Sequence, residues 1–171
     1  MACNQTLGGI ILDCASSVGG IKEVYIANYN DVTEVVVNGD KITGITSDGA
    51  VVFKKYEFRK QTGSMTSTLN VDETAGINYV STELNLVFTK METTKRIEIA
   101  ALATGQLAVI VKDGNNKYWY LGYNDYVSAT AGSANTGTAK GDSNNYSITL
   151  KDESDSFPYE VDESVIDTLG I

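Results

Sequence analysis

Alternating apolar and polar residues run through much of the chain and predict a series of β-strands. This period-two pattern covers residues 21–27, 51–60, 64–71 and 78–89, and in the last of these the even-numbered positions form the more apolar face. Residues 107–112 form a continuous apolar run, which is typical of a buried strand. The pattern therefore indicates a mainly β protein.

Turn residues separate these segments. Asn38-Gly39 stands between two runs of β-forming residues. Both residues tolerate the positive φ of a two-residue type I′ turn, so a hairpin is predicted there. Asp48-Gly49 predicts a second turn before the strand at 51–60. Neither face of that strand is wholly apolar, which favours an edge strand or one that contacts a neighbouring subunit.

The period changes after residue 89. Thr89 and Glu92 have the spacing of a capping box, in which the two side chains satisfy free backbone amides at a helix start. The residues that follow contain Ile97 and an Ala-Ala-Leu run, and they end at Gly105, a residue type common just after a helix. We predict one helix, at about 90–104, packed against a sheet.

The rest of the chain returns to β-structure. Residues 113–116, Asp-Gly-Asn-Asn, predict a turn before a strand at 117–123. Residues 128–144 are small and polar, and they fit either a flexible loop or strands around Gly137. Two further strands, at 146–151 and 157–161, are expected to form a closing hairpin around the acidic turn 151–155.

Three parts are predicted along the chain: an N-terminal arm at 1–20, a single β-sandwich domain at 21–162, and a C-terminal tail at 163–171. The arm is inferred because its paired glycines weaken both helix and strand. The tail is acidic but contains Val165 and Ile166, so we expect it to dock on a neighbour. The predicted fold class is mainly β, an antiparallel β-sandwich or small barrel with one packed α-helix.

Composition narrows the classes of function. The chain has 171 residues, of which 42% are apolar and 20% charged, as expected for one globular domain. Its net charge of −9 disfavours sequence-specific nucleic-acid binding, which depends on Lys and Arg, but would let DNA pass without sticking. Ten tyrosines give an aromatic set that suits interfaces.

Cys3 and Cys14 are the only cysteines. A disulfide, a metal pair and a lipid anchor are alternatives. Two unpaired thiols in a reducing compartment are the expected state, because the chain has no histidine to complete a zinc site and no signal-peptide pattern before Cys3. No run approaches the ~20 apolar residues of a membrane-spanning helix, so no membrane partner is expected.

The chain lacks the residues on which most catalytic sites depend. Without histidine, the usual serine and cysteine triads are excluded. Asp152, Glu153 and Asp155 are interpreted as turn residues, and 113–116 begins like a calcium loop without completing it. No phosphate-binding or dinucleotide motif occurs. We therefore predict a non-enzyme with no cofactor and no catalytic, cofactor-binding or metal-binding residue.

One aromatic cluster offers a different chemistry, because Tyr118, Trp119 and Tyr120 could stack on a sugar or a base. In a strand, however, Trp119 points away from its two neighbours. A core tryptophan flanked by interface tyrosines is the preferred interpretation.

From about residue 78 to 161 the chain resembles phage tail tube and related virion structural proteins, particularly those of phages of the Bacteroidetes. The resemblance covers about half of the chain and consists of the order of these segments and the kinds of residue in them, without a diagnostic motif. Besides the helix after Thr89, the resembling pieces are YVSTEL at 79–84, KYWYLG at 117–122, TGTAKGD at 136–142 and PYEV at 158–161.

This resemblance implies a β-sandwich subunit that forms rings, usually hexameric, stacked around a DNA channel in a virion assembled in the host cytoplasm. Its partners would be copies of itself and other virion proteins, with the N-terminal arm and the strand at 51–60 at the contacts. The alternatives are a capsid decoration or head–tail connector protein and, third, a carbohydrate-binding adhesin domain that uses Trp119.

Overall fold

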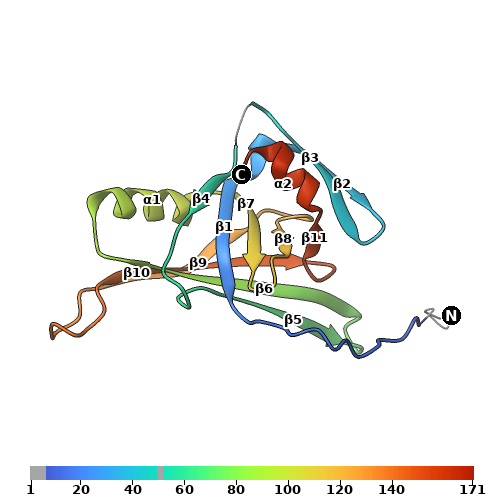
Figure 1. Ribbon diagram of the computed structural model, residues 1–171, viewed down its shortest axis with the longest axis horizontal. Coiled ribbons are helices and arrows are strands. Elements are labelled where there is room, and N and C mark those ends of the chain that lie inside the picture. Colours follow the sequence, from blue (N-terminus) through green and yellow to red (C-terminus); the bar gives the residue numbers. More distant parts are fainter. Residues whose placement is uncertain (1–6, 50–51) are drawn as a thin grey trace.

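The computed structural model describes residues 7–49 and 52–171, and in this part of the chain two β-sheets and two α-helices are formed (Figure 1). The predicted mainly β sandwich is confirmed. Sheet A has the strand order β2 (Val32–Asn38), β3 (Lys41–Ser47), β11 (Tyr159–Val161), β8 (Tyr118–Leu121), β7 (Leu107–Asp113), β1 (Ile21–Asn28) and β4 (Lys54–Tyr56). Sheet B has the order β5 (Ser64–Asp72), β6 (Ile77–Thr89), β10 (Asn145–Ser154) and β9 (Ser128–Asn135). The helices are α1 (Thr93–Thr104) and α2 (Glu163–Leu169), and a short 3-10 turn, η1 (Tyr29–Asp31), joins β1 to β2.

The first core lies between the two sheets. In β6 the even-numbered residues from Val80 to Phe88 are all buried, as their alternation predicts. Leu84, Leu86 and Phe88 pack in one core with side chains of sheet A and β10, among them Val24, Val109, Val111 and Leu150. Burial of these side chains is the main source of cohesion between the sheets.

A second core covers the opposite face of sheet A. Ile110 and Tyr120 lie on this face, 0% and 1% exposed, and helix α2 packs over it with Val165 and Ile166 buried. The interpretation of 163–171 as a tail that docks on a neighbour is therefore wrong for this chain: its apolar pair docks on its own sheet. The sequence could not decide between docking on a neighbour and docking on the chain's own sheet, because either surface would bury two adjacent apolar residues.

The β2–β3 hairpin is confirmed, but its turn is shifted by one residue. Asn38 ends β2 and pairs with Lys41, so the two central residues are Gly39 and Asp40. Gly39 has φ +67°, and Asn38 and Asp40 are not among the residues with positive φ. This is the pattern of a type II′ turn, in which glycine takes the first central position.

Helix α1 exists where expected, but its caps differ. Thr89 remains in β6, paired with Asn145, so it cannot cap the helix. Glu92 takes the N-cap position without a side-chain capping bond, and Gly105 at the other end is extended rather than left-handed. The prediction of a capping box is thus wrong, because its first residue, Thr89, is still paired in strand β6.

The structure also decides three further segments of the predicted β-structure. The strand at 51–60 is reduced to the edge strand β4, with Val51 outside the described residues. Residues 128–144 divide into strand β9 and a loop around Gly137, whose φ is +68°. The closing hairpin is wrong, because residues 151–154 belong to β10 in sheet B whereas β11 joins sheet A between β3 and β8.

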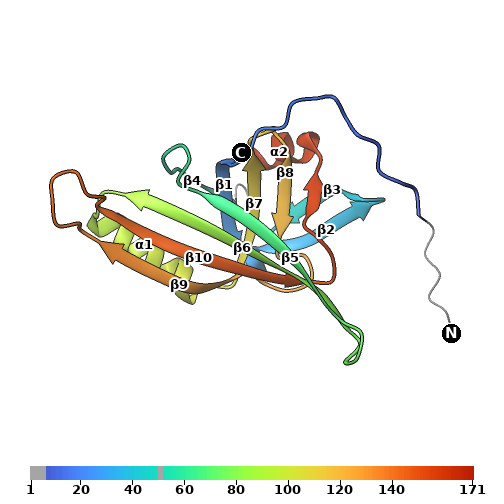
Figure 2. The ribbon, with the colours of Figure 1, turned by 90° about the horizontal axis from the view of Figure 1, so that it is seen from below.

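Strands of the two sheets cross steeply, so the long strands of sheet B extend beyond sheet A at both ends (Figures 1 and 2). At the end near residue 89 helix α1 covers the inner face by packing against β9 and β10, with Leu102 buried. The Tyr56 hydroxyl of β4 donates to the Glu98 carboxylate and ties this helix to sheet A. At the other end the β5–β6 hairpin projects from the body.

The described part of the N-terminal arm, residues 7–20, contains no helix or strand and is exposed. It runs along the outside of the body and away from it (Figure 2). The structure thus agrees with the arm interpretation for these residues. Cys14 is exposed on the arm, and Cys3 lies outside the described residues.

Replacing Leu84 by alanine should lower the free energy of unfolding by about 2–5 kcal/mol, because Leu84 is 0% exposed between the sheets. Leu12→Ala is the matched control, since Leu12 is 91% exposed and should change stability by less than about 0.5 kcal/mol. Urea unfolding of both variants measures the difference. Equal losses would contradict the assignment of the first core.

Candidate functional site

The three carboxylates of the predicted acidic turn do not form a common site. Asp152 lies on the buried face of β10. Glu153 faces outward and pairs with Lys151 at 2.7 Å. Asp155 follows the strand and accepts from the Asn124 side-chain amide at 3.0 Å. Within the described residues, no group of three acidic or cysteine side chains is placed to hold a metal ion.

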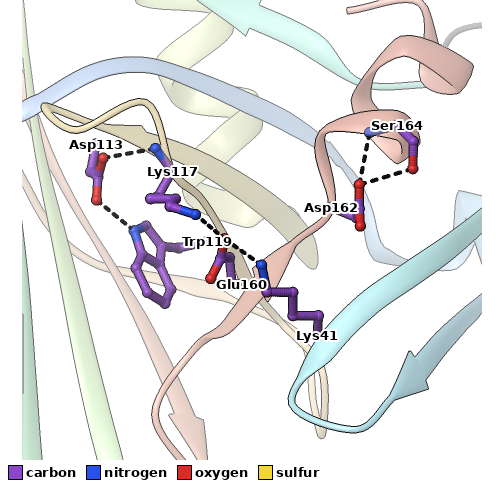
Figure 3. Close-up of polar contacts among 7 residues, drawn as sticks. All are labelled: Lys41, Asp113, Lys117, Trp119, Glu160, Asp162 and Ser164. Atoms are coloured by element: carbon purple, nitrogen blue, oxygen red, sulfur yellow. Dashed lines mark hydrogen bonds and ion pairs between the residues drawn. The ribbon is translucent and has the colours of Figure 1, made fainter.

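A polar cluster lies on sheet A where β3, β8 and β11 meet (Figure 3). Glu160 of β11 accepts from Lys41 at 3.0 Å and from Lys117 at 2.7 Å. These two bonds, with the Lys117 bond the stronger influence, hold the pKa of Glu160 below its usual range. The carboxylate therefore stays ionised and joins three strands, although exposed pairs of this kind stabilise by less than about 1 kcal/mol each.

The predicted turn at 113–116 is present and is organised by Asp113. One carboxylate oxygen accepts from the backbone amides of Asn115 and Lys117, at 2.7 and 2.9 Å. The other oxygen accepts from the indole nitrogen of Trp119 at 3.0 Å (Figure 3). Both oxygens of Asp113 thus accept hydrogen bonds that hold the turn and the start of β8, which is a structural role.

The aromatic interpretation of 118–120 was wrong in its assignment of faces. Tyr118 and Tyr120 are buried, 7% and 1% exposed, in the second core, whereas Trp119 is half-buried on the opposite face. The alternation itself is correct. Sequence could not assign the faces, because both faces of sheet A are covered and large aromatic residues fit either. Trp119 is thus only partly exposed, and its ring nitrogen is fixed by the bond to Asp113.

A depression of about 360 Å³ lies beside this cluster, lined by Lys41, Lys117, Glu160 and Asp162 among others. Asp162 accepts from the backbone amide of Ser164 at 3.1 Å and from its hydroxyl at 3.0 Å, and so caps α2 (Figure 3). The hydrogen bond from the Ser164 backbone amide is the main reason that the pKa of Asp162 is lowered. Of the acids that line the depression, Glu160 joins neighbouring strands and Asp162 caps α2, so both have structural contacts.

Asp152 is the one strongly perturbed acid in the core. It is 4% exposed, and one carboxylate oxygen accepts from the backbone amide of Gly122 at 3.2 Å. Burial raises its pKa to about 6, against the opposing effect of the Gly122 bond. The charges of Asp125 and Glu153 raise it further. The group joins β10 to the residue after β8. The interpretation of Asp152 as a turn residue is wrong, because β10 continues through Ser154.

The edge strands of the two sheets differ in how far their unpaired backbone groups are protected from pairing with another strand. Sheet A ends in β4, which has only three residues including Lys54 and Lys55, and in β2, which carries Glu34 and two register irregularities. Short length, charge and bulges are the devices by which proteins prevent edge pairing. Both edges of sheet A are therefore protected.

Sheet B has two unprotected edges. Strand β5 has nine residues, no charged side chain before Asp72, and an unbroken register against β6. Strand β9 has eight residues, none of them charged, but its register against β10 has one irregularity and helix α1 packs against it, so its edge is the less open of the two. Each is hydrogen-bonded to a neighbouring strand on one side only. These two strands form the candidate functional site, because each leaves a row of backbone amides and carbonyls without a strand partner; the alternation pattern did not reveal them as edges because edge position depends on topology.

Comparison of the chain with protein-family models, curated proteins and solved structures found no match. Within residues 7–49 and 52–171, no helix combines the length and the hydropathy that a membrane span requires.

Asp152→Asn should raise the free energy of unfolding at neutral pH, by on the order of 2 kcal/mol. The pKa of Asp152 is about 6 in the folded protein against an ordinary 3.8, so the folded state binds the proton more tightly. The wild-type free energy of unfolding therefore falls as the pH rises from about 4 to about 6, and stays lower above that range. Asparagine keeps an acceptor for Gly122 and removes the buried charge.

Urea unfolding of dilute protein at a series of pH values measures this effect. The gain from Asp152→Asn should be present at pH 7.5 and disappear at pH 4 and below. Asp40→Asn, on the exposed β2–β3 turn, is the matched control for the change in net charge. A gain independent of pH, or an equal gain in the control, would contradict the assignment.

Proposed function

We propose that this protein is a non-enzymatic virion structural protein, a phage tail tube subunit whose copies join into rings stacked around a DNA channel. The observation that carries the proposal is the contrast between the protected edges of sheet A and the unprotected edges of sheet B. A long, uncharged edge strand exposes unpaired backbone amides and carbonyls, which pair readily with another strand. Selection against aggregation should remove two such edges unless they pair in the functional state.

Strands β5 and β9 fit each other as partners. All neighbouring pairs within sheet B are antiparallel, and the sheet has four strands, so β5 and β9 run in opposite directions. When β5 of one copy lies beside β9 of the next, the antiparallel alternation continues through the contact. The two surfaces differ, so the contact is heterologous, and repeating it closes a ring or extends a filament.

The outer face of sheet B supports the channel part of the proposal. No helix lies over this face in the view from below (Figure 2). Side chains on it are largely hydroxyl and amide groups, and the charged ones along β6 and β10 are Glu83, Glu153 and Lys151. A surface without excess positive charge does not hold phosphates, so DNA would slide along it.

The exposed N-terminal arm also suits the second candidate, a capsid decoration or head–tail connector protein that attaches to a preformed lattice. Both candidates place the protein in the virion, assembled in the host cytoplasm. They differ in whether the isolated protein assembles by itself. The position of Trp119, half-buried and bonded to Asp113, gives the adhesin alternative no support.

Purified protein examined by negative-stain electron microscopy over a concentration series should form rings, and stacks of rings at higher concentration, with an open centre. Sedimentation velocity on the same samples should show a mass that grows with concentration. Isolated particles of one small size at every concentration would contradict the tail tube proposal, and binding of those particles to capsid or tail shells would favour the decoration or connector role.

Thr68→Lys should prevent ring formation, because it places a positive charge on the exposed side of β5 where a neighbouring strand has to pair. Thr33→Lys makes the same change on β2, the protected edge of sheet A, and should leave assembly unchanged. Sedimentation velocity measures assembly, and circular dichroism checks that both variants fold. Rings of Thr68→Lys as abundant as those of Thr33→Lys would show that β5 is not the contact.

A further inference from the structure

Five of the ten tyrosines of the chain gather around one depression on sheet A. The rings of Tyr123 and Tyr159 are in edge contact, with their centroids 4.9 Å apart, and the centroids of Tyr29 and Tyr126 are 6.3 Å apart. Tyr120 lies directly opposite Tyr159 in the pairing of β8 with β11. Half of the tyrosines thus form a local aromatic cluster.

This depression, which we call the tyrosine depression, has a volume of about 360 Å³ and is lined by Tyr29, Val32, Glu34, Tyr120 and Tyr123 among others. One wall is formed by η1 and the start of β2, and the other by the end of β8 and the loop that follows it. Tyr120 is only 1% exposed and belongs to the floor, whereas Tyr123 is 37% exposed and belongs to the rim. The rings therefore line the depression from its floor to its rim.

The loop that carries Tyr123 is fixed on both sides of this residue. Before it, Gly122 has a φ of +94°, and its backbone amide donates to the Asp152 carboxylate at 3.2 Å. After it, the side-chain amide of Asn124 donates to Asp155 at 3.0 Å. A ligand would therefore meet a wall that is already formed, and preorganisation of this kind reduces the cost of binding.

Glu34 is the only charged side chain among the described residues that line the tyrosine depression. The residue is exposed, and none of the ion pairs between described residues includes it. Burial raises the pKa of Tyr120, so the hydroxyl on the floor stays protonated and uncharged. The depression thus combines aromatic rings with one unpaired negative charge.

This combination favours a cationic ligand. The face of an aromatic ring attracts a cation, and the attraction grows when water is excluded. An anion would be repelled by Glu34, and a wholly apolar ligand would cover the carboxylate without giving it a partner, which costs free energy. Among the cations of proteins arginine fits best, because its planar, weakly hydrated guanidinium stacks on aromatic rings and pairs with a carboxylate through two parallel hydrogen bonds.

Exposed aromatic residues beside the depression favour an arginine that belongs to a protein. Tyr126, three residues after Tyr123, is 39% exposed, and Phe157, two residues before Tyr159, is 53% exposed. Aromatic residues and arginine are enriched among the residues that contribute most to binding between proteins. A partner surface would cover these rings while its arginine enters the depression.

We propose that the tyrosine depression binds an arginine side chain of a partner protein, with the guanidinium against the tyrosine rings and paired with Glu34. The site goes beyond the proposed function, because it lies on sheet A and does not involve strands β5 and β9. It also differs from strand pairing in kind. The backbone edge of β2 is protected, and the contact is made by side chains.

Saturation-transfer NMR with N-acetyl-L-arginine amide tests the site, because it detects weak binding through the ligand and applies to single subunits and assemblies alike. N-acetyl-L-citrulline amide is the matched ligand, since it has nearly the same shape without the charge. We expect the arginine derivative to bind at least about fivefold more tightly. Absence of saturable binding, equal affinity of the two derivatives, or tighter binding of methyl glucoside would overturn the proposal.

Substitutions in the depression identify the groups that bind the probe. Glu34→Gln removes the charge and Tyr123→Leu removes a ring, so each should weaken binding of the arginine derivative at least about threefold. Tyr123→Phe keeps the ring and should keep the affinity. The matched controls are Glu73→Gln, on the exposed β5–β6 turn, and Tyr79→Leu, since Tyr79 is also 37% exposed but lies on sheet B. With folding checked by circular dichroism, affinity unchanged by Glu34→Gln and Tyr123→Leu would overturn the proposal.

Electron microscopy of the same proteins separates this site from the proposed function. Rings that form although the arginine derivative does not bind would refute the arginine site alone. Binding of the derivative to a protein that forms no rings would refute the tail tube proposal and leave the site standing. Loss of rings both in Glu34→Gln and in a chain with Arg59→Lys and Arg96→Lys would show that a second copy supplies the arginine, and would overturn the assignment to a partner protein.

Discussion

The structure depends on burial of both faces of sheet A, and strand β7 is where this is clearest. Leu107, Val109 and Val111 face sheet B in the first core, and Ala108 and Ile110 face α2 and its neighbours in the second. A strand without a polar face can be stable only when it is covered on both sides. The continuous apolar run at 107–112 thus requires a layer on each side of sheet A.

Because the layers on the two sides differ, the molecule has one closed side and one open side. On one side α2 and the β2–β3 hairpin complete the second core within the chain. On the other side sheet B crosses sheet A steeply, so its long strands cannot be covered along their full length (Figure 2). Helix α1 covers one projecting end. The projecting β5–β6 hairpin, the edge strands β5 and β9 and the polar outer face therefore all belong to sheet B, and the proposed pairing between copies follows from this geometry.

The polar groups that attract attention in the sequence serve the fold. Asp113 organises a turn, Glu160 joins three strands, and Asp162 caps α2. Asp152 differs, because its buried carboxyl has a raised pKa near 6 and so opposes stability at neutral pH. Its backbone bond to Gly122 links the two sheets, and that link is the physical reason why a polar group lies in this core.

Local sequence determined most of the strands, the β2–β3 hairpin, the helix at 93–104 and the arm, because alternation, turn residues and paired glycines act within a few residues of each other. It also determined the buried face of β6 and the absence of histidine-based chemistry. The mixed faces of 51–60 also indicated an edge strand, as β4 is. Tertiary structure alone decided that β5 and β9 form edges, which face buries Tyr118 and Tyr120, that β11 leaves β10 for sheet A, and that residues 163–169 fold onto their own domain. Each of these outcomes depends on contacts between residues distant in the chain, and an apolar side chain is buried equally well by any surface that reaches it.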